Sequence, residues 1–262
     1  MTIRAGMGRA DVRLAGQGPR RRVRKTGASA VELAFYRDVA PRRVAYRVRT
    51  PRLHHCHAET GELELEYVPG KIDRQADRPA MIAQLARLHD APCLIDTAFR
   101  AAWPATLTAR AVDLFRLSRP DAARLFRLQT GAASLFEARG MICGDSNPGN
   151  WARRLGTAST LVQFDWERAG YGHPAIDLAP LAYGLPDAAT TDALAATYIA
   201  QRSVAPGDAD CLSIRIRIAC AWLICEVITT LADRDHALFE HYRRGYGQQL
   251  PAWLADVTAT LD

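Results

Sequence analysis

Residues Cys143–Asn150 read Cys-Gly-Asp-Ser-Asn-Pro-Gly-Asn, and Asp165 follows fifteen residues later at the end of the apolar run Leu161–Phe164. Asp145 precedes Asn150 by five residues. Asp, Asn, Pro and Gly are turn-forming residues, and short strands are expected on both sides of the segment. Such a pattern is either an ordinary turn between strands or a loop that brings two carboxylates and an amide together. The agreement of spacing, residue type and flanking strands favours the second interpretation.

Two carboxylates and an amide are the side chains that phosphoryl transfer requires. One carboxylate orients the acceptor hydroxyl, while the amide and the second carboxylate hold magnesium on the phosphates of ATP. Lys25 is notable because only Lys25 and Lys71 are lysine among 34 basic residues. In a strand Val23 and Lys25 share one face, and Arg22 and Arg24 share the other.

The first seventy residues alternate like strands, whereas the remainder is mainly helical. Ser29 can cap a helix that runs through Val39. Pro69 and Gly70 break the chain, so the sequence predicts one domain over 1–70 and a second over 71–262. Strands are predicted at Asp11–Leu14, Arg21–Lys25, Arg52–His57, Glu62–Val68, Met141–Ile142, Trp151–Arg153 and Leu161–Phe164, and further helices at 79–89, 105–117, 120–138, 174–184, 188–202, 208–232 and 236–260.

At these residues the chain resembles the aminoglycoside phosphotransferase and choline kinase family, which shares a two-lobed fold with protein kinases. The compact C-terminal helices resemble those of choline- and thiamine-kinase-like members. The resemblance implies an α+β fold with a small antiparallel-sheet N-lobe (1–70) and a larger helical C-lobe (71–262). It rests, in the family's order, on Val23–Lys25, Glu32–Arg37, Leu65–Gly70, Leu85–His89, Cys143–Asn150, Phe164–Glu167 and Gly170–Ala179.

The resemblance also implies roles for individual residues. Asp145 matches the catalytic aspartate, and Asn150 and Asp165 match the magnesium ligands. Lys25 would contact the α- and β-phosphates of ATP and would be held by Glu32 on the following helix. One departure is Cys143, which stands where the family usually has histidine.

The rest of the nucleotide site is expected from backbone groups. Gly6 and Gly8 could form a loop over the phosphates. The adenine would lie against the hinge and bond to the backbone of Glu66 and Val68. Asp177 matches an acid that braces the catalytic loop, so a structural role is expected for it.

Composition argues against several other classes of protein. The net charge of +6 is modest, and the run Arg20–Lys25 is better explained as a strand with an arginine face than as a nucleic-acid patch. No apolar stretch reaches the length of a membrane span. The six cysteines lack disulfide or zinc spacing, which suggests the cytoplasm. His54–His57 looks metal-like, but alternate side chains of a strand point to opposite faces, so at most two would converge.

The acceptor is the least defined part of the prediction. Trp222 and Glu226 lie one turn apart on an apolar helix, where they could bind a cation or could be a core residue and a salt-bridge partner. The sequence favours an ATP- and Mg²⁺-dependent transfer to a hydroxyl of a small, cationic molecule of the choline or thiamine type. The alternatives are an aminoglycoside-type antibiotic phosphotransferase and a catalytically silent nucleotide-binding protein. The oligomeric state cannot be inferred.

Overall fold

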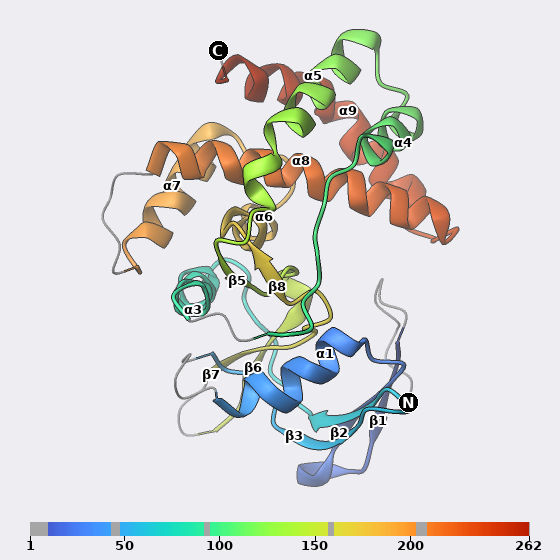
Figure 1. Ribbon diagram of the computed structural model, residues 1–262, viewed down its shortest axis with the longest axis vertical. Coiled ribbons are helices and arrows are strands. Elements are labelled where there is room, and N and C mark those ends of the chain that lie inside the picture. The colour runs from blue at the N-terminus through green and yellow to red at the C-terminus, as the bar shows by residue number, and fades with distance from the viewer. Residues whose placement is uncertain (1–9, 43–47, 92–94, 157–159, 203–208, 262) are drawn as a thin grey trace. The chain divides into compact units, whose positions relative to one another are not determined.

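The computed structural model describes residues 10–42, 48–91, 95–156, 160–202 and 209–261, and they form two compact units (Figure 1). Unit 1 comprises Met1–Arg100 and Ala138–Gly172. Unit 2 comprises Ala101–Glu137 and His173–Asp262. Each unit is therefore built from two separate stretches of the chain.

Unit 1 contains a four-stranded antiparallel sheet with the strand order β1-β2-β4-β3. Its side chains alternate as the sequence predicts. Leu63 and Leu65 are buried, and the register places Lys25 opposite Leu63, so that Lys25 also points inward. The strands are β1 (Asp11–Ala15), β2 (Arg22–Thr26), β3 (Leu53–His57) and β4 (Glu62–Glu66), which confirms the four strands predicted here.

The helix predicted after Ser29 is present, but its second half is wound more loosely. Helix α1 spans Ala30–Ala34 and continues as a π-helical turn, Phe35–Val39. The Ser29 hydroxyl accepts a hydrogen bond of 3.1 Å from the Glu32 amide, which caps the helix as expected. Both Glu32 and Phe35 are buried, so the helix turns one acidic and one aromatic side chain into unit 1.

Unit 1 does not end at Gly70, where the sequence suggested a domain boundary. The amide of Gly70 donates to the Arg153 carbonyl at 3.0 Å, and the Arg153 amide donates back at 2.7 Å. A Cβ on Gly70 would lie 2.4 Å from that carbonyl oxygen, so glycine permits the pairing. This long-range bridge, with an ion pair between Arg153 and Asp77, joins the following segments to the unit that holds the sheet.

These later segments of unit 1 include the strands that precede and follow the loop Cys143–Asn150. They are helix α3 (Arg78–His89) and the short strands β5 (Gly140–Ile142), β6 (Trp151–Arg154), β7 (Thr160–Gln163) and β8 (Gly170–Gly172). The strands predicted at Trp151–Arg153 and Leu161–Phe164 are β6 and β7, which form an antiparallel pair. Strand β8, which pairs with β5, was not predicted, because three residues with two glycines carry no alternating pattern.

Unit 2 is helical and contains α4 (Ala105–Phe115), α5 (Arg119–Gly131), α6 (Ala175–Ala182), α7 (Ala188–Ile199), α8 (Ala209–Asp233) and α9 (Phe239–Ala259). Helix α8 packs against the other five, which explains why its sequence is apolar on most sides (Figure 1). Helix α5 ends at Gly131, earlier than predicted, and a short 3-10 turn at Ala133–Leu135 follows. Among the described helices, none combines the length and hydropathy of a membrane span.

Candidate active site

Lys25 joins three elements of unit 1 through two ion pairs. Its Nζ atom lies 2.7 Å from Oε2 of Glu32 on α1 and 2.7 Å from Oδ1 of Asp165 after β7. Lys25 and Glu32 are almost fully buried, whereas the Asp165 side chain is 31% exposed. The neighbouring Arg24 faces outward and pairs with Glu62. The strand register thus selects Lys25 as the inward-pointing cation, as the alternation predicted.

Burial and charge compete at this cluster. Burial disfavours the charge on Lys25, but the carboxylates of Glu32 and Asp165 outweigh it and hold the pKa of Lys25 above its ordinary value. Burial raises the pKa of Glu32 to about 7, although Lys25 opposes the shift and Asp165 adds to it. Two carboxylates therefore share one ammonium group, so the cluster retains a demand for positive charge.

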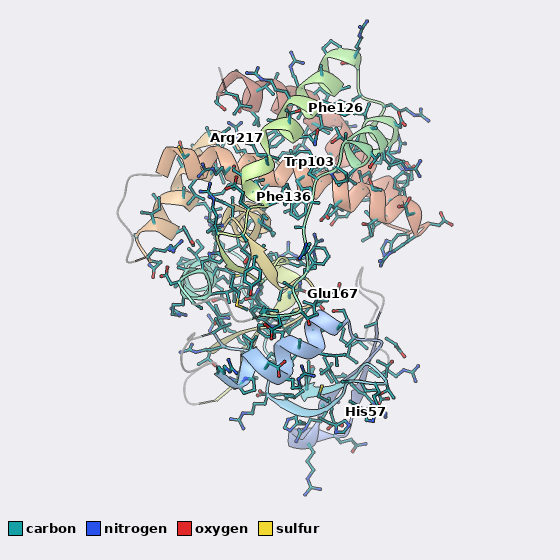
Figure 2. All side chains as sticks on the ribbon, in the orientation of Figure 1. His57, Trp103, Phe126, Phe136, Glu167 and Arg217 are labelled. Carbon is teal, nitrogen blue, oxygen red and sulfur yellow. The ribbon has the colours of Figure 1, made fainter. Side chains whose placement is uncertain are left out.

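Glu167 adds a third carboxylate to the cluster around Lys25 and so increases its excess of negative charge. Carboxylate oxygens of Glu32, Asp165 and Glu167 lie within 4.8 Å of one another (Glu167 is labelled in Figure 2). Glu32 is almost fully buried, whereas Asp165 and Glu167 are partly exposed, so Asp165 and Glu167 are the carboxylates that suit a metal ion. Sequence analysis did not assign Glu167, although its place two residues after Asp165 was a usable signal. The carboxylate oxygens of Asp165 and Glu167 are the kind of ligand that magnesium prefers.

Asp165 is held in an uncommon backbone conformation. Its φ is 64°, in the left-handed region that residues other than glycine seldom adopt. The next residue, Trp166, is fully buried and stacks on Phe35 with ring centroids 3.9 Å apart and planes 7° from parallel. The indole N–H of Trp166 also donates to the Gln163 carbonyl at 3.1 Å. These contacts fix the turn, and such strain is often found at functional sites.

The loop Cys143–Asn150 is held by its own hydrogen bonds. Asn147 Oδ1 accepts from the Gly149 amide at 2.9 Å, and the Asn147 carbonyl accepts from the Asn150 amide at 2.8 Å. The Trp151 indole donates to the Ser146 carbonyl at 3.0 Å. These hydrogen bonds, two of which involve a side chain, explain the Asp-Ser-Asn-Pro-Gly-Asn composition and stabilise the loop.

One hydrogen bond ties this loop to the segment before Asp165, and a second one orients the Asn150 side chain within the loop. The amide of Phe164 donates to the Asn150 carbonyl at 3.0 Å, which ties the two segments together. Asn150 Nδ2 donates to the Asp145 carbonyl at 3.1 Å. The amide nitrogen of Asn150 is thereby used, and its Oδ1 is the atom that could bind a cation beside Asp165. The residues present therefore fit a magnesium ion.

Asp145 is half-buried, and its carboxylate accepts a hydrogen bond of 3.3 Å from the Asn147 amide. Burial raises the pKa of Asp145 to about 6; the positive charge of Arg168 opposes this shift, and the negative charge of Asp165 adds to it. The carboxyl is therefore mostly ionised at neutral pH, yet its affinity for a proton is higher than that of an ordinary aspartate. These are the properties of a general base.

The residues assigned from the sequence to the rest of the nucleotide site are Gly6, Gly8, Glu66 and Val68. Gly6 and Gly8 lie outside the described residues. Glu66 ends β4, and its carboxylate binds the Arg154 guanidinium through two contacts of 2.7 Å. Val68 is half-buried in the segment after β4. Backbone contacts from Glu66 and Val68 to an adenine stay a prediction.

The structure does not support Trp222 as an acceptor contact. The Trp222 side chain is fully buried in unit 2, and its indole N–H donates to the Ala102 carbonyl at 3.1 Å. Its ring packs edge-on against Phe136 at 5.2 Å (Phe136 is labelled in Figure 2). A tryptophan enclosed in this way is a core residue, because no ring face is left for a ligand. Glu226 is half-buried on the same helix, and Asp177 on α6 is fully buried.

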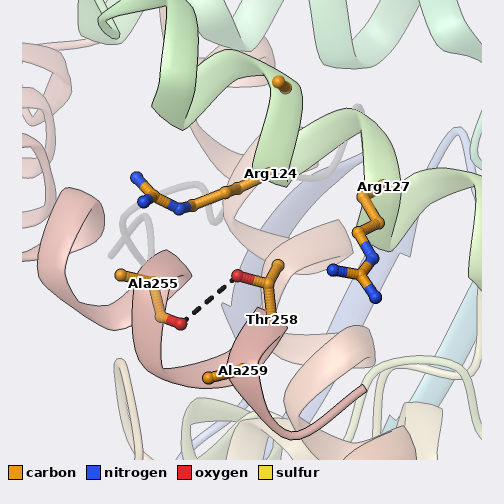
Figure 3. A pocket seen from close by; sticks show the side chains of 6 residues that line it. Arg124, Arg127, Ala255, Thr258 and Ala259 are labelled. Atoms are coloured by element: carbon orange, nitrogen blue, oxygen red, sulfur yellow. Dashed lines mark hydrogen bonds between the residues drawn. The ribbon is translucent and has the colours of Figure 1, made fainter. Parts of the chain in front are cut away.

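A pocket of about 390 Å³ opens between α5 and α9 of unit 2 (Figure 3). Arg124 at its wall forms an ion pair with Asp121 at 2.7 Å, and the Thr258 hydroxyl donates to backbone carbonyls of its own helix. None of the residues assigned to phosphoryl transfer lines it. The pocket is lined by Ala123, Arg124, Arg127, Ala255, Thr258 and Ala259.

The chain is similar to known phosphotransferases in sequence pattern and in fold. A family model described as "Phosphotransferase enzyme family" matches residues 12–211. A comparison with curated proteins finds no match. A solved structure of a microcompartment-associated aminopropanol kinase has 14% identity and a TM-score of 0.67, over 98% of this chain and 90% of that one.

Two further solved structures are comparably similar. A choline/ethanolamine kinase family protein from Mesorhizobium loti has 18% identity and a TM-score of 0.63, over 98% of this chain and 92% of that one. A macrolide 2'-phosphotransferase type I has 17% identity and a TM-score of 0.63, over 95% of this chain and 90% of that one. At these identities the likeness shows the fold, which is the predicted α+β, protein-kinase-like fold with an antiparallel sheet in its N-terminal region and a helical C-terminal region.

Proposed function

Because the chain belongs to the phosphotransferase enzyme family, we propose that it transfers the γ-phosphoryl group of ATP to a hydroxyl of a small molecule. The observation that carries this proposal is the double ion pair of Lys25 with Glu32 and Asp165, formed next to the loop that holds Asp145. In this fold, phosphoryl transfer depends mainly on positioning and charge neutralisation. Unit 1 supplies both kinds of group.

Asp145 has the role of catalytic base in this proposal. Its carboxylate would orient the acceptor hydroxyl and accept its proton as the oxygen attacks phosphorus. A pKa raised to about 6 suits that role, because the group is ionised at neutral pH and still binds a proton readily. Within the 143–150 loop, the Asn147 amide donates a hydrogen bond of 3.3 Å to this carboxylate and helps to orient it.

Lys25 has the role of phosphate contact in this proposal. The magnesium ligands would be Asn150, Asp165 and Glu167. When bound, magnesium would neutralise the charge that develops on the phosphates. Lysine is a compact point charge that phosphate oxygens can approach from several directions. Glu32, buried behind Lys25, keeps the ammonium group aimed into the site. Backbone groups of Glu66 and Val68 would receive the adenine.

The acceptor is proposed by class. A cationic hydroxylated molecule of the choline or thiamine type is the first candidate, and structures similar to this chain bear the names of choline/ethanolamine and aminopropanol kinases. An antibiotic acceptor is the alternative, because another similar structure is named a macrolide phosphotransferase. The burial of Trp222 removes the aromatic contact that favoured a cation, so the choice between these classes depends on assay.

We place the reaction in the cytoplasm, where free thiols such as those of the described cysteines stay reduced.

An acceptor panel tests this proposal. ADP release would be measured with ATP and magnesium in the presence of choline, ethanolamine, aminopropanol, thiamine, an aminoglycoside and a macrolide. We expect one class to be phosphorylated, and Asp145→Asn to slow that reaction by about 10²–10⁴-fold. If the protein binds magnesium and ATP but phosphorylates none of the panel, the silent nucleotide-binding alternative is favoured. If it does not bind ATP, the proposal fails.

A further inference from the structure

Arg168 lies three residues after Asp165, and its guanidinium group is held by an aromatic ring. The guanidinium carbon lies 4.9 Å from the centroid of the Phe99 ring, a cation–π contact. Phe99 is fixed in turn by its backbone, because its amide donates to the Ala169 carbonyl at 2.8 Å and it forms a parallel bridge with Gly170. A Cβ on Gly170 would lie 2.2 Å from the Phe99 carbonyl oxygen, so the two segments approach as closely as glycine allows.

The backbone of Arg168 also touches the loop that carries Asp145. A Cβ built on Gly144 would lie 2.2 Å from the Arg168 carbonyl oxygen and 2.9 Å from the Arg168 Cβ. The residue directly before Asp145 is therefore in contact with Arg168. The charge of Arg168 reaches the carboxylate as well, since it is the main influence that opposes the burial of Asp145 and lowers its pKa.

We infer that Arg168 is a positioning residue that holds the Asp145 carboxylate toward the acceptor hydroxyl, with Phe99 holding the guanidinium in place. The carboxylate is then fixed from two directions, by the Asn147 amide and by the positive charge of Arg168. Orientation of a base matters because a misplacement of about 1 Å can cost about 10²-fold in rate. The inference rests on the proposed function, which gives Asp145 its role.

The test separates charge from packing at position 168. Arg168→Gln removes the charge, and we expect it to lower kcat by about 10–100-fold with little change in the KM for ATP. Arg168→Lys restores a positive charge and should recover most of kcat. Phe99→Leu should lower kcat less than Arg168→Gln does. The double variant should be no worse than Arg168→Gln alone, because Phe99 acts through Arg168. Arg124→Gln in the pocket of unit 2 is the matched control and should keep wild-type kcat.

Three results would overturn the inference. Arg168→Gln could keep wild-type kcat, Arg168→Lys could be as slow as Arg168→Gln, or the effects of Phe99→Leu and Arg168→Gln could multiply. A wild type that transfers no phosphoryl group would refute the proposed function instead. In that case crystal structures of the wild type and Arg168→Gln still decide the inference. A rotated Asp145 carboxylate in the variant supports it, and an unchanged carboxylate contradicts it.

Discussion

Gly144→Ala is predicted to damage both stability and catalysis, for reasons that can be separated. Gly144 has a φ of +73°, and a Cβ at this position would lie 2.2 Å from the Arg168 carbonyl oxygen. An alanine in the left-handed region costs about 1–2 kcal/mol. An added methyl group in a packed site costs about 1–3 kcal/mol more. We therefore expect the free energy of unfolding to fall by about 2–5 kcal/mol.

Two other glycines serve as matched controls. Gly184 has a φ of +86° with nothing within 4 Å of a Cβ, so Gly184→Ala reports backbone strain alone. Gly131, at the end of α5, has neither a positive φ nor a close neighbour. Gly131→Ala should leave stability unchanged or raise it by up to about 1 kcal/mol, because alanine favours helix.

Urea unfolding followed by circular dichroism gives the stabilities, and steady-state kinetics give kcat. The predicted order of stability is Gly131→Ala, then Gly184→Ala, then Gly144→Ala. Only Gly144→Ala should lower kcat, since relief of the contact with Arg168 must move the backbone next to Asp145. The reasoning is refuted if Gly144→Ala and Gly184→Ala lose equal stability, because the close approach to Arg168 would then carry no cost.

Other predictions concern the charged groups of the site. Lys25→Arg should raise the KM for ATP, because a planar fork cannot replace a buried point charge that contacts two carboxylates at 2.7 Å; kinetics equal to wild type would point to Arg24 instead. Asp165→Ala should abolish the magnesium-dependent thermal shift caused by ATP, and Asn150→Ala should weaken it less; an undiminished shift in Asp165→Ala contradicts the metal assignment. The rate should fall as the pH drops through about 6, because the raised pKa of Asp145 means that protonation removes the base there; a rate unchanged down to about pH 5 would contradict this assignment.

Local patterns were sufficient to predict much of unit 1. The alternation of β2 identified Lys25 as the inward cation, and the Ser29 cap located the helix that carries Glu32. The loop at 143–150 is stabilised by hydrogen bonds between near neighbours in sequence, so its composition reveals its conformation. The sequence therefore indicated the residues that the structure brings together around Lys25.

Features that depend on distant parts of the chain could not be predicted. The contact of Phe99 with Arg168 joins segments far apart in sequence, and strand β8 has too few side chains to show a period. The bridge between Gly70 and Arg153 could not be predicted for the same reason. The two interpretations of Trp222 could not be separated from the sequence, because a helical spacing of an aromatic and an acid is the same in a core as in a binding site.

The most direct test of the central claim follows the γ-phosphorus of ATP by phosphorus NMR, with magnesium and the acceptor identified in the panel. We predict that the γ signal of ATP is replaced by a phosphate-ester signal as ADP forms, and that Asp145→Asn slows this conversion by about 10²-fold or more. Release of inorganic phosphate without an ester, or an ester formed equally fast by Asp145→Asn, would contradict it.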